Sequence, residues 1–219
     1  MNIWLQNESS VLTDAQVQAA LPAFQRQCWH VRAWWGAFAT IKFGKPPVAD
    51  AWQILILDDS DQAGALGYHD FTPGGRPIAK VFAKTDIENY RTWTVTLSHE
   101  LVEMLVDPWI SAAMQTSNTR FYALELGDPV EADELGYTIT TKGAKPVLVS
   151  DFALPNWFIP GSPGRYDYKG HCTAPLEVLP GGYAQWHDGS GWHQVDAQGM
   201  AMTLEGSARF RDRSTPWTS

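Results

Sequence analysis

The sequence predicts an α+β fold, in which a twisted mixed β-sheet is backed by one helix and carries a second helix beneath it. Two segments show apolar residues at helical spacing, and a group of short β-rich runs lies between them. Beyond the second helix, proline and glycine become frequent and the pattern is irregular. We therefore divide the 219-residue chain into an N-terminal subdomain, residues 1–110, and a loop-rich C-terminal subdomain, residues 111–219, which closes a cleft.

The first predicted helix has signals at both of its ends. Thr13 followed by Gln16 forms a capping box, and Leu12 with Val17 forms a hydrophobic staple. Apolar residues then recur at helical spacing until Gly36, which ends the pattern. We expect the apolar face of this helix to pack on the sheet.

Four β-rich runs follow the first helix. Residues 39–43 and 52–57 are expected to be neighbouring central strands. Residues 65–69 and 78–82 are joined by a segment that contains Pro73-Gly74-Gly75, which predicts a hairpin or a looped edge strand. An open edge can pair with an extended chain. The residues expected to form this edge are Leu66, Gly67, Tyr68 and His69.

The second predicted helix, residues 92–107, contains the motif His-Glu-Leu-Val-Glu at positions 99–103. Residues four apart lie on the same face of a helix, so His99 and Glu103 can bind one ion, and Asp107 extends that face by a turn. Zinc accepts imidazole nitrogen and carboxylate oxygen. Charged groups in an apolar helix are costly to bury unless a metal compensates them. The sequence therefore predicts a divalent metal site on this helix.

The third metal ligand is expected downstream of the helix. Glu125 is the first choice, because it lies about one connection further along the chain. Asp128 and Asp107 are alternatives, either as ligands or as acceptors for the second nitrogen of His99, which would fix its tautomer. Glu100 is expected to act as the general base for a water on the metal.

The order of helix, strands, edge strand and HExxE helix resembles the N-terminal half of the zincin metallopeptidases, over about residues 10–130. A glutamate about twenty residues after the motif, here Glu125, resembles the third ligand of the gluzincin branch. The chain departs from the pattern at Glu103, where most zincins have a second histidine. The resemblance implies Zn2+, and the added negative charge makes Ca2+, Mn2+ or Fe2+ alternatives.

Over most of its length the chain also resembles an uncharacterised family of bacterial and phage proteins. This resemblance lies in residues 98–108, 125–131, 149–152 and 180–183. It implies a bacterial or phage setting and supplies no activity.

These features predict a metal-dependent hydrolase, and within that class a zinc metallopeptidase with a peptide or protein substrate. Tyr166 is expected to be the phenol that stabilises a tetrahedral oxyanion, with Tyr168 and Tyr183 as alternatives. His69 and His171 can also approach the site as a ligand, a proton donor or a substrate contact, although such histidines are more often surface residues.

Three other interpretations remain open at this point. The first is a non-catalytic, metal-stabilised structural or binding protein, for example one associated with a phage, with a closed coordination sphere. The second is a carbohydrate- or surface-binding module, suggested by tryptophans in expected loops: Trp34, Trp35, Trp157, Trp186 and Trp192. The third is a calcium-binding loop formed by acidic residues, although apart from Asp128 a solvated acidic loop is the favoured interpretation: Asp128, Glu131, Asp133 and Glu134.

Composition argues against two classes of partner. The formal net charge is −8 and no cluster of lysine or arginine interrupts it, so we expect no nucleic acid as partner. No apolar run reaches the roughly 20 residues of a membrane span, and residues 1–13 lack the pattern of a signal peptide. We therefore expect no membrane partner and a cytoplasmic location, unless the protein is exported by another route or associates with a virion. The sequence carries no signal of oligomeric state.

Overall fold

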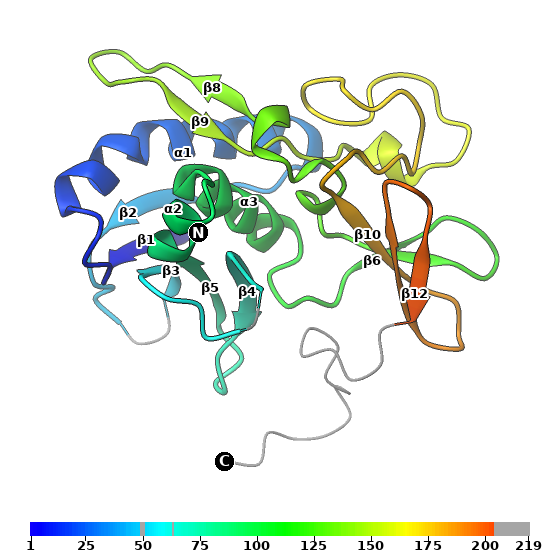
Figure 1. Cartoon of the computed structure of the whole chain (residues 1–219), viewed down its shortest axis with the longest axis horizontal. Coiled ribbons are helices and arrows are strands. Elements are labelled where there is room, and N and C mark those ends of the chain that lie inside the picture. Colours follow the sequence, from blue (N-terminus) through cyan, green and yellow to red (C-terminus); the bar gives the residue numbers. More distant parts are fainter. Residues whose placement is uncertain (49–50, 63, 204–219) are drawn as a thin grey trace.

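A computed structural model describes residues 1–48, 51–62 and 64–203, and it shows an α+β protein with two five-stranded sheets (Figure 1). The first sheet has the strand order β2-β1-β3-β5-β4. Its strands are β1 (Asn2–Asn7), β2 (Thr40–Phe43), β3 (Trp52–Leu57), β4 (Gly67–Phe71) and β5 (Pro77–Phe82). The strands β2, β1, β3 and β5 are parallel, and β4 is antiparallel at the edge. The predicted mixed sheet and its edge strand are therefore confirmed.

The strand β1 was not anticipated, and it changes the order of the sheet. It pairs with β2 on one side and with β3 on the other, so the prediction that residues 39–43 and 52–57 are neighbours is wrong. The physical reason is the crossover: β1, the first helix and β2 form a unit in which the helix returns the chain to a parallel strand. Ile3 and Leu5 alternate with Trp4 along β1, and both are fully buried.

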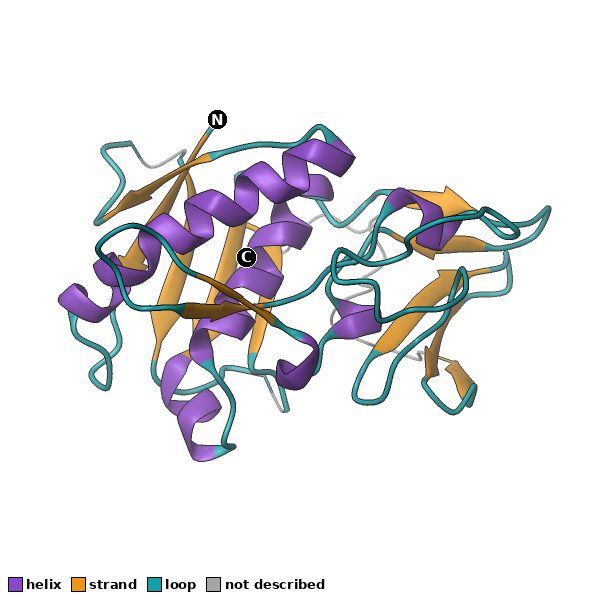
Figure 2. Ribbon diagram, turned by 90° about the horizontal axis from the view of Figure 1, so that it is seen from above, coloured by secondary structure: helices purple, strands orange, loops and turns teal. Residues whose placement is uncertain are grey.

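Three helices accompany this sheet: α1 (Asp14–Trp35), α2 (Ala83–Glu88) and α3 (Trp93–Val106). The start of α1 has the predicted capping box between Thr13 and Gln16, and its end has Gly36 in the left-handed conformation. Figure 2 shows the two long helices on one face of the sheet, and α1 also contacts α3. In the described part of the chain, no helix is long and apolar enough to cross a membrane.

The C-terminal half contains a second sheet, so the prediction of an irregular C-terminal part is wrong in this respect. The sheet is antiparallel and has the order β12-β11-β10-β7-β6. Its strands are β6 (Ala113–Gln115), β7 (Phe121–Ala123), β10 (Tyr183–His187), β11 (Trp192–Asp196) and β12 (Ala201–Thr203). A hairpin of β8 (Tyr137–Ile139) and β9 (Val147–Val149) packs on α1 and α3. Three short 3-10 turns complete the fold: Asp128–Val130, Asp133–Leu135 and Pro155–Phe158.

Buried side chains from both halves of the chain form one hydrophobic core. Trp157 is 1% exposed, and Phe158 packs edge-on against Trp35 at 5.8 Å between ring centroids. The indole of Trp35 donates a hydrogen bond to the Ala153 carbonyl, and Trp186 is buried. Most of the tryptophans that suggested a surface-binding module therefore have packing roles; of the five, Trp34 is clearly exposed.

A buried pair of carboxyl groups, Asp151 and Asp167, organises the long connection before β10. The Asp167 carboxylate accepts hydrogen bonds from the backbone N–H groups of Gly170, His171 and Cys172. Burial and the neighbouring Asp167 raise the pKa of Asp151 to about 9. Burial alone would raise the pKa of Asp167, but hydrogen bonds from Asp151 and the backbone lower it overall. The pair therefore shares one proton at neutral pH.

We expect Asp151→Asn to stabilise the protein increasingly as the pH rises from about 4 to about 9. Because the folded pKa of Asp151 is raised, its contribution to stability is complete below the unfolded pKa and is lost as the pH rises through the folded value. An amide can donate to Asp167 without titrating, which removes a slope of about 1.4 kcal/mol per pH unit. Denaturant unfolding of both proteins across this range measures the difference, and parallel stability curves would contradict it. Asp167→Asn should be destabilising at every pH, because an amide nitrogen cannot accept the backbone N–H groups.

Candidate metal centre

Helix α3 is held on both sides, which fixes the positions of its charged residues. At its start, the Thr92 N–H donates a hydrogen bond of 2.8 Å to Asp133. Along its length, the Ser98 hydroxyl accepts the Ser150 N–H at 2.7 Å. His99, Glu100 and Glu103 are at most 8% exposed. These ionisable side chains are thus inside the protein, where each charge requires a compensating partner.

The first group of possible metal ligands is formed by His99, Glu103 and Asp128. The Nε2 atom of His99 lies 3.3 Å from Oε1 of Glu103 and 3.4 Å from Oδ1 of Asp128. The Gly127 N–H donates a hydrogen bond of 3.0 Å to the same Glu103 oxygen, which ties the loop after β7 to the helix. Of the two carboxylates considered after the helix, Asp128 is therefore the one beside His99.

The second group is formed by His69, Glu103 and Glu125. His69 lies on β4 opposite Ala79, and the alternation of the strand directs it toward α3. Its Nδ1 atom is 3.4 Å from Oε2 of Glu103, and its Nε2 atom is 3.6 Å from Oε2 of Glu125. Glu125, the expected third ligand of the His99 site, is therefore grouped with His69. His69 itself is 5% exposed, so it is no surface residue.

The carboxylates and imidazoles of the two groups change one another's pKa. Burial alone would lower the pKa of His69, but Glu125, Glu100 and Glu103 raise it well above the ordinary value. Burial has the same effect on His99, whose pKa is raised well above the ordinary value by Glu103 and Asp128. The two histidines in turn lower the pKa of Glu103 well below its usual range, although burial opposes this. A metal would have to displace protons from these imidazoles.

Three residues considered for the site lie elsewhere. The Asp107 carboxylate accepts the N–H groups of Ser111 and Ala112 at 2.8 and 2.9 Å, so it caps the turn after α3. The Tyr166 hydroxyl donates to the Ser162 carbonyl at 2.8 Å, and Tyr166 does not line the cavity described below. His171 lies near Asp151 at 4.0 Å and approaches the Leu135 carbonyl at 3.1 Å. Asp151, Asp167 and His171 form a third possible metal group, but backbone N–H groups already occupy both aspartates.

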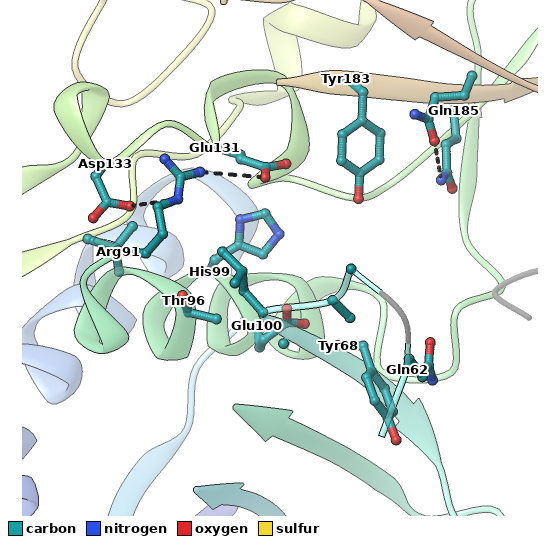
Figure 3. Close-up of a pocket in the computed structure, with 16 residues that line it drawn as sticks. Gln62, Tyr68, Arg91, Thr96, His99, Glu100, Glu131, Asp133, Tyr183 and Gln185 are labelled. Atoms are coloured by element: carbon teal, nitrogen blue, oxygen red, sulfur yellow. Dashed lines mark hydrogen bonds and ion pairs between the residues drawn. The ribbon is translucent and has the colours of Figure 1, made fainter. Parts of the chain in front are cut away.

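A cavity of about 750 Å³ opens beside His99 and Glu100. Figure 3 shows Tyr183 and Gln185 on one side of it, Tyr68 and Gln62 on another, and the helix residues His99 and Glu100 between them. Tyr183 is directed into the cavity, so it occupies the place that was expected for Tyr166. Residues from both the N-terminal and the C-terminal half of the chain therefore line the cavity.

The acidic residues considered for a calcium loop do not converge on one point but contact different residues. Arg91 lies 3.9 Å from Glu131 and 3.8 Å from Asp133 at the rim of the cavity. Glu134 is exposed, and Asp128 lies beside His99. A separate calcium loop is therefore not assembled by these four residues.

Gly67 lets the edge strand approach α3 closely. A Cβ atom at this position would lie 2.8 Å from Cγ2 of Thr96 and 2.9 Å from Oε1 of Glu100. Residues Leu66, Gly67 and Tyr68 line the cavity, next to Glu100. The predicted edge strand is therefore a wall of the site.

We expect Gly127→Ala to weaken metal binding roughly 10- to 100-fold, the usual range for residues that position a ligand. A Cβ atom at Gly127 would lie 2.4 Å from Nδ1 and 2.6 Å from Cε1 of His99, so the imidazole would have to move. The backbone of Gly127 has φ −78° and ψ −34°, which alanine adopts without strain, so the contact alone causes the effect.

Competition with a chromophoric chelator measures this change. Gly74→Ala is the matched control, because a Cβ atom there meets only Thr72 at 3.7 Å. Equal metal affinities of the two variants would contradict the role of Gly127.

The sequence signal for His69 and Tyr183 as site residues is weak. The signal for His69 is present in the strand: it stands two residues after Gly67, on the same face, and that face is covered by α3. Tyr183 reaches the site through β10, whose pairing with β7 joins Trp186 to Tyr122, far apart in sequence. No local pattern predicts that pairing.

Comparisons with protein-family models, curated proteins and solved structures found no match for the chain.

Proposed function

We propose that this chain is a zincin-like metal-dependent hydrolase that cleaves peptide bonds, with a divalent ion, zinc in the first instance, held by His99, Glu103 and Asp128. The observation that carries the proposal is the position of one atom. Nε2 of His99 faces a carboxylate oxygen of Glu103 and another of Asp128, while the adjacent Glu100 faces a large cavity.

The distances from His99 to Glu103 and to Asp128 fit a metal ion bound between the three side chains. The distances of 3.3 and 3.4 Å from His99 Nε2 exceed the about 2.7–3.2 Å of an N–H···O hydrogen bond. Two ligands bonded at ~2.05 Å to a tetrahedral ion are ~3.3 Å apart. Glu103 and Asp128 are both fully buried, so their carboxylates require a compensating cation.

The adjoining cavity favours a catalytic site over a purely structural one. Structural metal sites are closed, whereas catalytic sites keep a position open to water and substrate. His99 and Glu100 line the cavity, and Glu103 and Asp128 lie behind them, outside its lining. The site is therefore open on the side of the general base and enclosed on the other.

In the proposed reaction, a bound metal supplies Lewis acidity, which polarises the scissile carbonyl and makes water a better nucleophile. Glu100 takes a proton from the attacking water as the oxygen–carbon bond forms, and gives it to the leaving nitrogen as the carbon–nitrogen bond breaks. Glu100 is placed for this role because it lines the cavity beside His99. Tyr183, on the facing wall, is positioned to donate to the developing oxyanion.

An extended peptide is the substrate that the cavity walls suit best. β4 is the edge strand of its sheet, and the segment leading into it lines the cavity. A peptide can pair with such an edge through backbone hydrogen bonds, which places a carbonyl beside Glu100.

The first test is metal content. Protein purified without added metal or affinity tag is expected to contain at least one divalent ion per chain, and His99→Ala is expected to lose at least one equivalent. His187→Ala is the control, since His187 lies on β10 away from both ligand groups. Elemental analysis gives the ratio and the identity of the metal. The absence of metal in wild type and His99→Ala, with unchanged folding, would mean that the helix carries only a charged face.

A further inference from the structure

His69 has an environment that the single metal site does not explain. Its side chain is 2% exposed, and neither ring nitrogen has a hydrogen-bond partner among the described residues. Nδ1 lies 3.5 Å from Oε2 of Glu100 and 3.4 Å from Oε2 of Glu103. Nε2 lies 3.6 Å from Oε2 of Glu125. A buried imidazole is thus surrounded by carboxylate oxygens at distances that hydrogen bonds do not account for.

The separation at Nδ1 of His69 is close to those in the first group, whereas Glu125 faces the other ring nitrogen. Ligands of a tetrahedral ion with bonds of ~2.05 Å stand ~3.3 Å apart, and the distance from His69 to Glu103 is 3.4 Å. One ligand atom each from His69, Glu103 and Glu125 lies within 4.8 Å of the others. The three side chains can therefore hold an ion of their own.

Glu103 belongs to both groups, and it presents a different oxygen to each. Oε1 faces Nε2 of His99 at 3.3 Å, and Oε2 faces Nδ1 of His69 at 3.4 Å. A carboxylate that is arranged in this way can bridge two ions, and hydrolytic two-metal centres hold their ions about 3.5–4 Å apart.

The balance of charge supports two ions. Four carboxylates, from Glu100, Glu103, Glu125 and Asp128, are each at most 4% exposed. One divalent ion together with a protonated His69 compensates three of these charges, whereas two divalent ions compensate all four. Uncompensated buried charges are strongly unfavourable.

From these contacts we infer that His69 and Glu125 hold a second divalent metal ion, and that the Glu103 carboxylate bridges it to the ion held by His99 and Asp128. This inference rests on the proposed function for the first ion. It makes the centre binuclear, with one imidazole for each ion and a shared glutamate from α3.

The number of ions tests the inference. Metal-free protein is equilibrated with Zn2+, freed of excess ion by gel filtration and measured by elemental analysis. We expect two ions per wild-type chain, and one in His69→Asn and in Glu125→Gln. Two ions are expected in the control His187→Asn, whose residue lies outside both groups. Circular dichroism checks the folding of each variant, and Glu125→Gln decides the result if His69→Asn does not fold.

The outcomes separate this inference from the proposed function. One ion in wild type and one in both variants would overturn the second site and leave the first in place. No ion in wild type would overturn both. Two ions that persist in His69→Asn and Glu125→Gln would place the second ion elsewhere and overturn the assignment.

A second readout tests the bridge. In protein loaded with Mn2+, electron paramagnetic resonance should show two exchange-coupled ions in wild type and an isolated ion in Glu125→Gln. Two uncoupled ions in wild type would contradict bridging by Glu103.

Discussion

Glu100→Gln is expected to lower turnover by about 10²- to 10⁴-fold, the usual contribution of a general base, while metal content remains that of wild type. The amide has nearly the shape of the carboxylate but cannot take up a proton. Glu100 lines the cavity and belongs to neither group of metal ligands, so the substitution leaves both groups intact. Initial rates on a fluorogenic peptide library and elemental analysis of the same preparations measure the two quantities.

Glu134→Gln provides the control for this experiment. Glu134 is exposed, and its substitution removes the same single negative charge as Glu100→Gln. Its rate and metal content should equal those of wild type. Full turnover in pure Glu100→Gln protein would refute the proposed mechanism, even if the metal site is correct.

The second large effect is expected for Glu103→Ala, which should lose metal binding and with it the stabilisation that metal provides. A ligand present at 100 times its Kd stabilises the folded state by about 2.7 kcal/mol. Glu103 is fully buried, faces both histidines and accepts the Gly127 N–H, so its removal takes a ligand from both groups. Thermal melts with and without Zn2+ should show a rise in Tm for wild type and none for Glu103→Ala.

The exposed Glu88, at the end of α2, supplies a matched control. Glu88→Ala should keep the metal-dependent rise in Tm. If Glu103→Ala also keeps that rise, the ion is bound elsewhere and the proposed ligand set is wrong.

The parts of the fold that the sequence predicts are those with local causes. The start of α1 depends on Thr13 and Gln16 and its end on Gly36, all within a few residues of the feature they determine. Likewise, α3 has an apolar pattern that ends before Pro108. These helices differ from prediction by about one residue at each end, which is the usual uncertainty of a helix boundary.

The parts that the sequence does not predict depend on distant partners. β7 has three residues and is a strand because it pairs with β6 and with β10. β1 takes its place because α1 returns the chain beside it. Short strands of this kind have no periodicity long enough to be distinguished from loops.

In the candidate site, too, the sequence predicts what has a local cause and not what depends on distant contacts. The helix motif predicts His99, Glu100 and Glu103 as a cluster, because the geometry of a helix fixes their relative positions. The choice between Glu125 and Asp128 depends on how the loop after β7 meets α3, through the hydrogen bond from Gly127 to Glu103. That contact joins residues far apart in sequence, so no spacing rule could rank the two carboxylates.

The candidate ligands come from an edge strand, a helix and the loop after β7, between residues 69 and 128. An ion that joins these three segments would close two loops of the chain, much as a pair of covalent cross-links would. Unlike a covalent cross-link, the ion needs the folded site to bind, so metal loading should leave the unfolded chain unconstrained and should act chiefly on native-state opening. Hydrogen exchange in β4 and in the loop after β7 would slow together when the ion binds, because neither segment could then separate from α3 alone.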